Sequence, residues 1–146
     1  MGRADDTDLA QRSGLASLAA EMAEHGTSRE APVREVMGLL GDRWSTLILL
    51  VLAIGEWRHA ELRRALARLS AEQAISQRVL TLKLRTLERD GFVLRSVTDD
   101  VPPKVSYGLS TLGKALHGQT RAMIAWVNAN EQAILAARDA FDRADD

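Results

Sequence analysis

Three arginines in the segment 76–89 occupy positions that an α-helix would place on one face. At about 100° per residue, Arg78, Arg85 and Arg89 fall within about 40° of one another and opposite the direction of Leu80. An arginine can donate two hydrogen bonds to O6 and N7 of guanine, which is the commonest specific contact in the major groove of DNA. The spacing therefore predicts a helix that can read DNA bases, with Arg78 as the leading base-reader.

Other side chains in and after this segment extend the candidate surface. Glutamine can bind adenine through two hydrogen bonds, and an exposed leucine can contact the methyl group of thymine. Farther along the chain, Asp99 and Asp100 would be repelled by phosphate, so we expect the basic residues on either side of them to bind the DNA backbone. The predicted DNA-binding residues are Ser76, Gln77, Arg78, Thr81, Leu82, Arg85, Arg89, Arg95 and Lys104.

The charge distribution along the chain supports this interpretation, although the net charge is only −1. Residues 58–114 carry eleven Lys and Arg against six Asp and Glu, whereas the segments before and after carry an excess of negative charge. A basic central segment between acidic ends is typical of a protein whose central segment binds nucleic acid and whose ends do not contact it. On charge alone, a solvated surface explains the pattern equally well.

Several other functions lack the residues they require. The sequence has no cysteine, and its histidines at 25, 59 and 117 share no helical turn, so we expect no metal site, no cofactor and no enzyme. The longest apolar run, 47–54, is far shorter than the roughly 20 residues that span a bilayer. The acidic first thirty residues are unlike a signal peptide, which predicts a cytoplasmic protein with no membrane partner.

The pattern of apolar residues predicts which elements position the basic residues. Helical spacing is expected from Asp8, with Gln11 as a capping partner, to residue 24, and again from Pro32 to Gly41. Further helices are expected at 43–53, 59–69 and 76–89, with a short extended piece at 56–58. The last of these helices could instead start near Ala71, if Ser70 and Gln73 formed a capping box, but we favour a start near Ser76.

The pattern changes after Gly91. FVLRSV (92–97) and KVSYGL (104–109) are rich in β-branched and aromatic residues and are separated by turn residues, which predicts an antiparallel hairpin. A long helix is expected from about Thr111, and from Leu116 to Phe141 it carries a seam with alternating steps of four and three residues. Such a seam is typical of a coiled coil between two copies of a chain. A helix lying on its own domain is the alternative.

These elements predict a mainly α protein with a small β-hairpin wing (α+β), a winged helix-turn-helix with amino- and carboxy-terminal dimerisation helices. We expect a helical extension at 1–30, the DNA-binding domain at 31–111 and a dimerisation helix at 112–146. The predicted dimer-interface residues are Leu15, Leu18, Met22, Leu116, Met123, Val127, Asn130 and Ile134. Asn130 could pair with its symmetry mate and fix the register.

Four motifs, LLGDRWSTLIL, ELRRAL, ISQRVLTLKLRTLERDGFVLR and VPPKVSYGLSTLGKAL, together resemble those of the HxlR-type, MarR-like regulators over about residues 31–127. The resemblance implies a bacterial transcriptional repressor or activator that binds an inverted repeat as a homodimer. The matching segments imply a reading helix at Ser76–Arg89 and a wing at Phe92–Leu109. The family often has a cysteine before the proline of its first core helix, where this chain has Ala31.

We therefore expect a sequence-specific regulator, acting as a repressor on double-stranded DNA. The alternative is a winged-helix module that uses the same surface to bind a protein. An unknown small-molecule effector is conceivable near Trp44, Trp57 or Trp126, but packing is the simpler role for these side chains.

Overall fold

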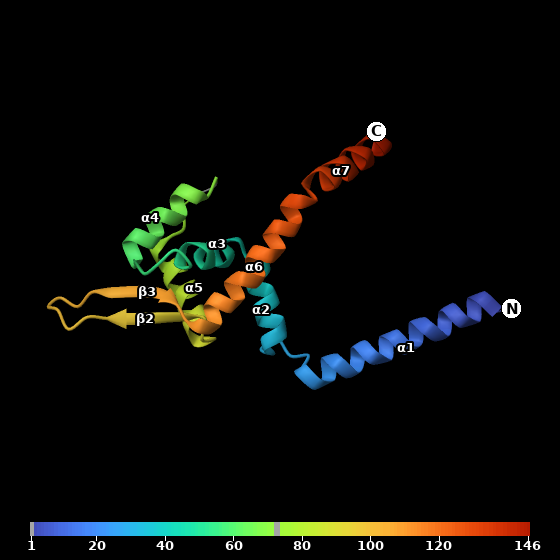
Figure 1. The fold of residues 1–146 in the computed structure, drawn as a ribbon, viewed down its shortest axis with the longest axis horizontal. Helices are drawn as coiled ribbons and strands as arrows, with labels where there is room; N and C mark the ends of the chain where they lie inside the picture. Colours follow the sequence, from blue (N-terminus) through green and yellow to red (C-terminus); the bar gives the residue numbers. More distant parts are fainter. Residues whose placement is uncertain (1, 72–73) are drawn as a thin grey trace. The chain divides into compact units, whose positions relative to one another are not determined.

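The computed structural model describes residues 2–71 and 74–146. Within these residues it contains seven helices and three short strands (Figure 1). The chain divides after Asp42 into two compact units, of which the second is Arg43–Asp146. No helix in the described part of the chain has the length and apolar character needed to cross a membrane. The division into functional parts at residues 30 and 111 stays a prediction.

The first unit holds helices α1 (Gly2–His25) and α2 (Pro32–Gly41). The prediction that the first helix starts at a capping pair of Asp8 and Gln11 is wrong, because Asp8 lies inside α1 and its carboxylate pairs with Arg12 at 2.9 Å, one turn later. The second helix begins and ends where the sequence predicts. Proline suits the first turn of a helix because the missing N–H would have no helical partner there.

The second unit contains helices α3 (Arg43–Leu52), α4 (His59–Leu69) and α5 (Gln77–Arg89), which lie near one another (Figure 1) and bury apolar side chains. Leu80, Leu84 and Leu87 form a buried stripe along α5. On α4 the buried leucines are Leu62 and Leu66, whereas Leu69 at its carboxyl end is 58% exposed. The buried apolar side chains of these three helices are Ile48, Leu49, Val51, Leu52, Leu62, Leu66, Leu80, Leu84 and Leu87.

The predicted hairpin is confirmed as strands β2 (Val93–Val97) and β3 (Val105–Leu109), which pair in antiparallel register. The short extended piece forms a third strand, β1 (Trp57–Arg58), on the other side of β3, so the strand order is β1-β3-β2. The indole N–H of Trp57 donates to the carbonyl of Val51 at 2.9 Å. This bond ties the sheet to the end of α3 and gives Trp57 a packing role.

Helix α6 (Thr111–Ala129) begins close against the start of β2. Ser110 caps it by accepting a hydrogen bond from the N–H of Gly113 at 3.0 Å, and the N–H of Ser110 donates to the carbonyl of Phe92. A Cβ at Gly113 would lie 2.0 Å from that carbonyl oxygen. Only glycine allows α6 to approach this closely.

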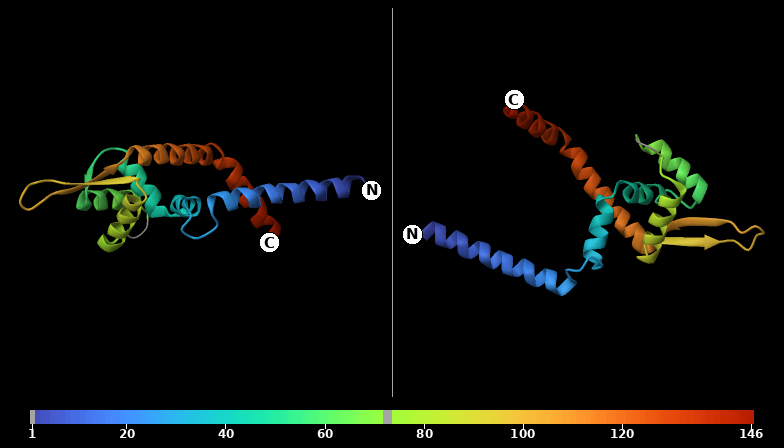
Figure 2. Two further views of the ribbon diagram at one scale, coloured as in Figure 1. Left: turned by 90° about the horizontal axis from the view of Figure 1, so that it is seen from below. Right: turned by 180° about the vertical axis from the view of Figure 1, so that it is seen from behind.

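The predicted continuous helix from residue 111 is wrong, because the chain turns at Asn130 and then forms a separate helix, α7 (Glu131–Asp145). Figure 2 shows the change of direction between α6 (orange) and α7 (red). The side-chain amide of Asn130 donates to the carbonyl of Trp126 at 2.8 Å, and its backbone N–H donates to the carbonyls of Trp126 and Val127. An asparagine side chain that bonds to its own backbone competes with helix continuation.

Candidate nucleic-acid interface

The start of α5 is fixed by two local contacts. The hydroxyl oxygen of Ser76 accepts a hydrogen bond from the N–H of Val79 at 3.1 Å and so caps the helix. The Nε–H of Arg63 on α4 donates to the carbonyl of Ile75 at 3.0 Å, which ties the residue just before Ser76 to α4. The favoured start near Ser76 is confirmed and a start near Ala71 is wrong, while the proposed capping partner Gln73 lies outside the described residues.

The outward face of α5 is basic and exposed. Three of its four leucines, Leu80, Leu84 and Leu87, are no more than 1% exposed, while the three arginines predicted on the opposite face are all exposed. Gln77 is exposed at the amino-terminal entry of the helix, and Leu82 beside the arginines is 53% exposed. Helix α5 therefore presents hydrogen-bond donors and the apolar side chain of Leu82 along its exposed face.

The hydroxyl of Thr81, like that of Ser76, already has partners within the chain. The Thr81 hydroxyl donates to the carbonyl of Gln77 at 2.9 Å, and its oxygen lies 3.0 Å from Nε2 of His59. His59 is the first residue of α4, and its ring meets that of Tyr107 on β3 edge to face, with centroids 6.4 Å apart. Burial of the imidazole, and to a smaller extent the charge of Arg63, lowers the pKa of His59 below its ordinary value of 6.5.

The wing carries its two predicted phosphate-binding residues on exposed positions. Arg95 lies on β2 opposite Tyr107, and Lys104 immediately precedes β3. The backbone N–H and carbonyl of Lys104 bond to the hydroxyl and the N–H of Thr98, both at 2.9 Å, which closes the hairpin below its tip. Asp99 and Asp100 lie exposed beyond this closure, so the acidic tip and the basic base of the wing are separate.

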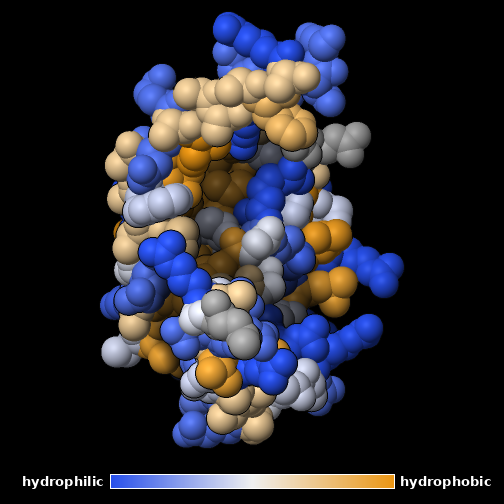
Figure 3. All heavy atoms as spheres, turned by 90° about the vertical axis from the view of Figure 1, so that its right-hand side faces the viewer, coloured by the Kyte–Doolittle hydropathy of each residue, from blue (hydrophilic) through white to orange (hydrophobic). Residues whose placement is uncertain are grey.

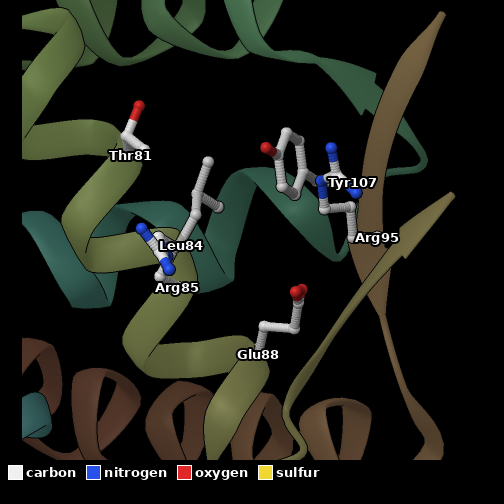
Figure 4. A pocket seen from close by; sticks show the side chains of 6 residues that line it. All are labelled: Thr81, Leu84, Arg85, Glu88, Arg95 and Tyr107. Atoms are coloured by element: carbon white, nitrogen blue, oxygen red, sulfur yellow. The ribbon is translucent and has the colours of Figure 1, made fainter. Parts of the chain in front are cut away.

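Residues of α5 and of the sheet line a hollow of about 400 Å³. Figure 4 shows Thr81, Leu84, Arg85 and Glu88 on α5, facing Arg95 and Tyr107 on the strands. The hollow brings together Arg85 and Arg95, which lie ten residues apart in the sequence. Sequence reasoning missed Glu88 and Tyr107. Two signals in the sequence indicate these residues. Glu88 lies two helical turns after Thr81 on α5, and Tyr107 pairs with Arg95 in the predicted hairpin.

The predicted dimer-interface residues fall into two groups. Those of α1, together with Met123 and Val127 of α6, are exposed, at fractions from 42% to 69%. Leu116, Asn130 and Ile134 are half-buried within the chain. The neighbouring Trp126, 60% exposed, lines an open hollow of about 490 Å³ on α6 with Met123. Figure 3 shows hydrophobic residues (orange) exposed on one face of the molecule beside hydrophilic ones (blue).

The first part of the predicted seam packs within the second unit. Thr120, the second seam position, is only 4% exposed, and its hydroxyl donates to the carbonyl of Leu116 at 3.0 Å. The first half of α6 therefore packs on its own domain, which was the alternative to a coiled coil between two copies of the chain. Contact of the other seam positions with a second copy of the chain stays a prediction.

The chain shares this architecture with solved regulators. The uncharacterized HTH-type transcriptional regulator YtfH of Escherichia coli is 35% identical over 112 residues, which cover 77% of this chain and 84% of that protein. A structure of the putative transcriptional regulator ytfH from Salmonella typhimurium aligns with a TM-score of 0.61 at 34% identity, covering 77% of this chain and 95% of that one. The reduced form of the transcriptional regulator YodB from Bacillus subtilis aligns with a TM-score of 0.57 at 36% identity, covering 66% and 90%.

A family model supports the same conclusion over the part of the chain that carries the interface. The model of the HxlR-like helix-turn-helix matches residues 39–134, a range that includes α3 to α6, the three strands and the start of α7. This range contains every residue of the candidate DNA-binding surface. The fold is a winged helix-turn-helix, and the chain belongs to the HxlR-like helix-turn-helix family.

Proposed function

We propose that this chain is a transcription regulator that binds double-stranded DNA sequence-specifically as a homodimer and represses transcription from an inverted-repeat operator. One observation carries the proposal. A capped helix, α5, presents exposed Gln77, Arg78, Arg85 and Arg89 opposite a buried leucine stripe and beside a hairpin with basic residues at its base. The names of the relatives, which are transcriptional regulators, support it.

The geometry of α5 fits the major groove. That groove is about 12 Å wide and admits one helix, whose amino-terminal residues then meet base edges. Gln77 and Arg78 are the first two residues of α5, so they would reach deepest, and Leu82 would lie one turn behind them. Arg95 and Lys104 on the wing would bind phosphates, which hold the register of the protein without reading sequence.

A homodimer is supported by the apolar side chains that α1 and α6 leave exposed. A second copy would cover them, and two-fold symmetry would then present two α5 helices to half-sites about 34 Å apart, one turn of DNA. A dimer seated on an operator represses by blocking access to the promoter. Such a regulator acts on the chromosome, so we place its action in the bacterial cytoplasm.

The protein-binding alternative is favoured by one feature, the exposed acidic tip of the wing formed by Asp99 and Asp100. A tip of this charge suits a basic partner rather than phosphate. The two functions differ in what they predict for α5. If α5 reads bases, the protein prefers one DNA sequence and loses that preference when Arg78 is removed. If the wing binds a protein instead, the protein has no preferred DNA sequence and removal of Arg78 changes none.

The test is a selection of preferred sites from a random duplex library, followed by anisotropy titrations of the selected site. Arg78→Ala should weaken binding to that site by about 1–3 kcal/mol and relax the preference at one base pair in each half-site. Arg29→Ala removes the same charge from an exposed turn between α1 and α2 and serves as the matched control. Selection of no preferred site by the wild-type protein, or equal losses in both variants, would overturn the proposal.

A further inference from the structure

His59 connects three elements that meet around the hollow between α5 and the sheet. It is the first residue of α4, its Nε2 lies 3.0 Å from the hydroxyl oxygen of Thr81 on α5, and its ring meets Tyr107 on β3. Thr81 and Tyr107 are themselves two of the residues that line this hollow. A single side chain therefore spans from the reading helix to the wing.

The direction of the hydrogen bond follows from the other partner of Thr81. The hydroxyl proton of Thr81 is directed to the carbonyl of Gln77, at 2.9 Å, so its oxygen is left to accept a hydrogen bond from His59. A neutral imidazole with its proton on Nε2 supplies that bond. The lowered pKa of His59 and its place at the amino-terminal end of α4 both favour the neutral form.

We propose that His59 is a positioning residue, which fixes the orientation of α5 relative to the wing through Thr81 and Tyr107 and thereby sets how the first turn of α5 meets DNA bases. On this proposal Thr81 acts through that bond rather than by reading a base. The inference rests on the proposed DNA-binding function and names a further residue that its specificity depends on. Arg85 and Arg95, on the two walls of the hollow, would keep their spacing through the same contact.

The experiment is a double-mutant cycle measured on DNA affinity. His59→Phe keeps an aromatic ring against Tyr107 but removes the N–H donor, and Thr81→Val keeps the shape of the side chain but removes the acceptor. Each should lower affinity for the selected site about three- to tenfold, the effect of one hydrogen bond. The double variant should lose no more than either single variant, because the two residues act through one bond.

Rescue and non-specific binding separate positioning from a merely structural role. His59→Gln and Thr81→Ser, which keep a donor and a hydroxyl, should restore most of the affinity. Affinity for a scrambled duplex should stay near the wild-type value, because the phosphate contacts are unchanged. The thermal midpoint should fall by no more than the loss of one hydrogen bond explains. If His59→Phe does not fold, His59→Leu takes its place in the cycle, because a loss in Thr81→Val alone would also follow from a lost base contact.

Three results would overturn the inference: full affinity of Thr81→Val for the selected site, additive losses in the double variant, or equal losses on selected and scrambled DNA. A wild-type protein that selects no site would refute the DNA-binding proposal itself. A wild-type protein that selects a site, with variants that bind it equally well, would refute the role of His59 alone.

Discussion

The contact between α6 and the start of β2 leads to a sharp prediction about stability. Gly113→Ala places a Cβ 2.0 Å from the carbonyl oxygen of Phe92, although real Cβ atoms essentially never approach an atom within 3.0 Å. Helix and strand must therefore move apart by at least about 1 Å at this point. The obstacle is backbone rather than the end of a flexible side chain, so relaxation is costly.

The expected free energy follows from three terms. Overpacking of this kind costs about 1–3 kcal/mol. The hydrogen bond from the N–H of Ser110 to the carbonyl of Phe92, 3.0 Å long, would be stretched or lost, at about 1 kcal/mol. Replacing glycine by alanine within a helix returns about 1 kcal/mol. The net prediction is a loss of about 1–3 kcal/mol in the free energy of unfolding, since the last two terms offset each other.

Helix α6 supplies its own control. A Cβ at Gly118 would meet no atom within 4 Å, so Gly118→Ala should gain up to about 1 kcal/mol from helix propensity alone. Urea unfolding at one fixed protomer concentration measures both variants, and an unchanged m-value would allow their midpoints to be compared. A Gly113→Ala protein as stable as the Gly118→Ala protein would refute the close approach of α6 to β2.

Three further predictions concern assembly, signalling and pH. Lysine at both Met123 and Trp126 should shift the proposed dimer toward monomers in light scattering, whereas lysine at Val101, 97% exposed on the wing, should not; a dimer that persists unchanged would place the interface elsewhere. Diamide should not release DNA, because reversible thiol oxidation needs a cysteine and the sequence has none; release reversed by dithiothreitol would contradict this. Because burial and Arg63 lower the pKa of His59, the folded state binds fewer protons than the unfolded chain below about pH 6.5, and unfolding free energy should fall as pH drops from 7 toward 5. The fall in unfolding free energy should be smaller in His59→Phe. Identical pH profiles of stability for the wild-type protein and His59→Phe would refute the contribution of His59.

Helix α5 could be predicted from the sequence because its determinants are local. Leu80, Leu84 and Leu87 recur at helical spacing, and Ser76 bonds to a backbone N–H three residues later. The outward direction of Arg78 follows from the same periodicity. The hairpin was equally accessible, since its two strands are close in sequence and each carries a strand-like composition.

The features that the sequence did not reveal depend on contacts between distant residues. Strand β1 has only two residues, and its pairing with β3 joins Trp57 to Tyr107, fifty residues later. The bond between His59 and Thr81 likewise spans two helices. Neither contact leaves a periodic pattern, so only the folded chain shows that a histidine with no metal-ligand spacing lies against the reading helix.

The turn at Asn130 was missed for a different reason. The alternating steps of four and three residues continue through this position, so the apolar pattern predicts one helix from α6 to the end of α7. The side chain of Asn130 bonds instead to the carbonyl of Trp126, and this local contact ends α6. A periodic pattern indicates which residues could share a helix face. It does not indicate where a side chain bonds to a backbone carbonyl and so ends the helix.

The most direct test of DNA binding through a basic helix and wing is the salt dependence of affinity for the selected site. Each phosphate that the protein neutralises releases counterions, so the logarithm of the binding constant should fall linearly with the logarithm of salt concentration, with a slope of about −0.9 per phosphate. We expect a steep slope for the wild-type protein and a slope smaller by about one for each of Arg95→Ala and Lys104→Ala. A flat response to salt, with the wing variants unchanged, would contradict DNA binding by this surface and favour a protein partner.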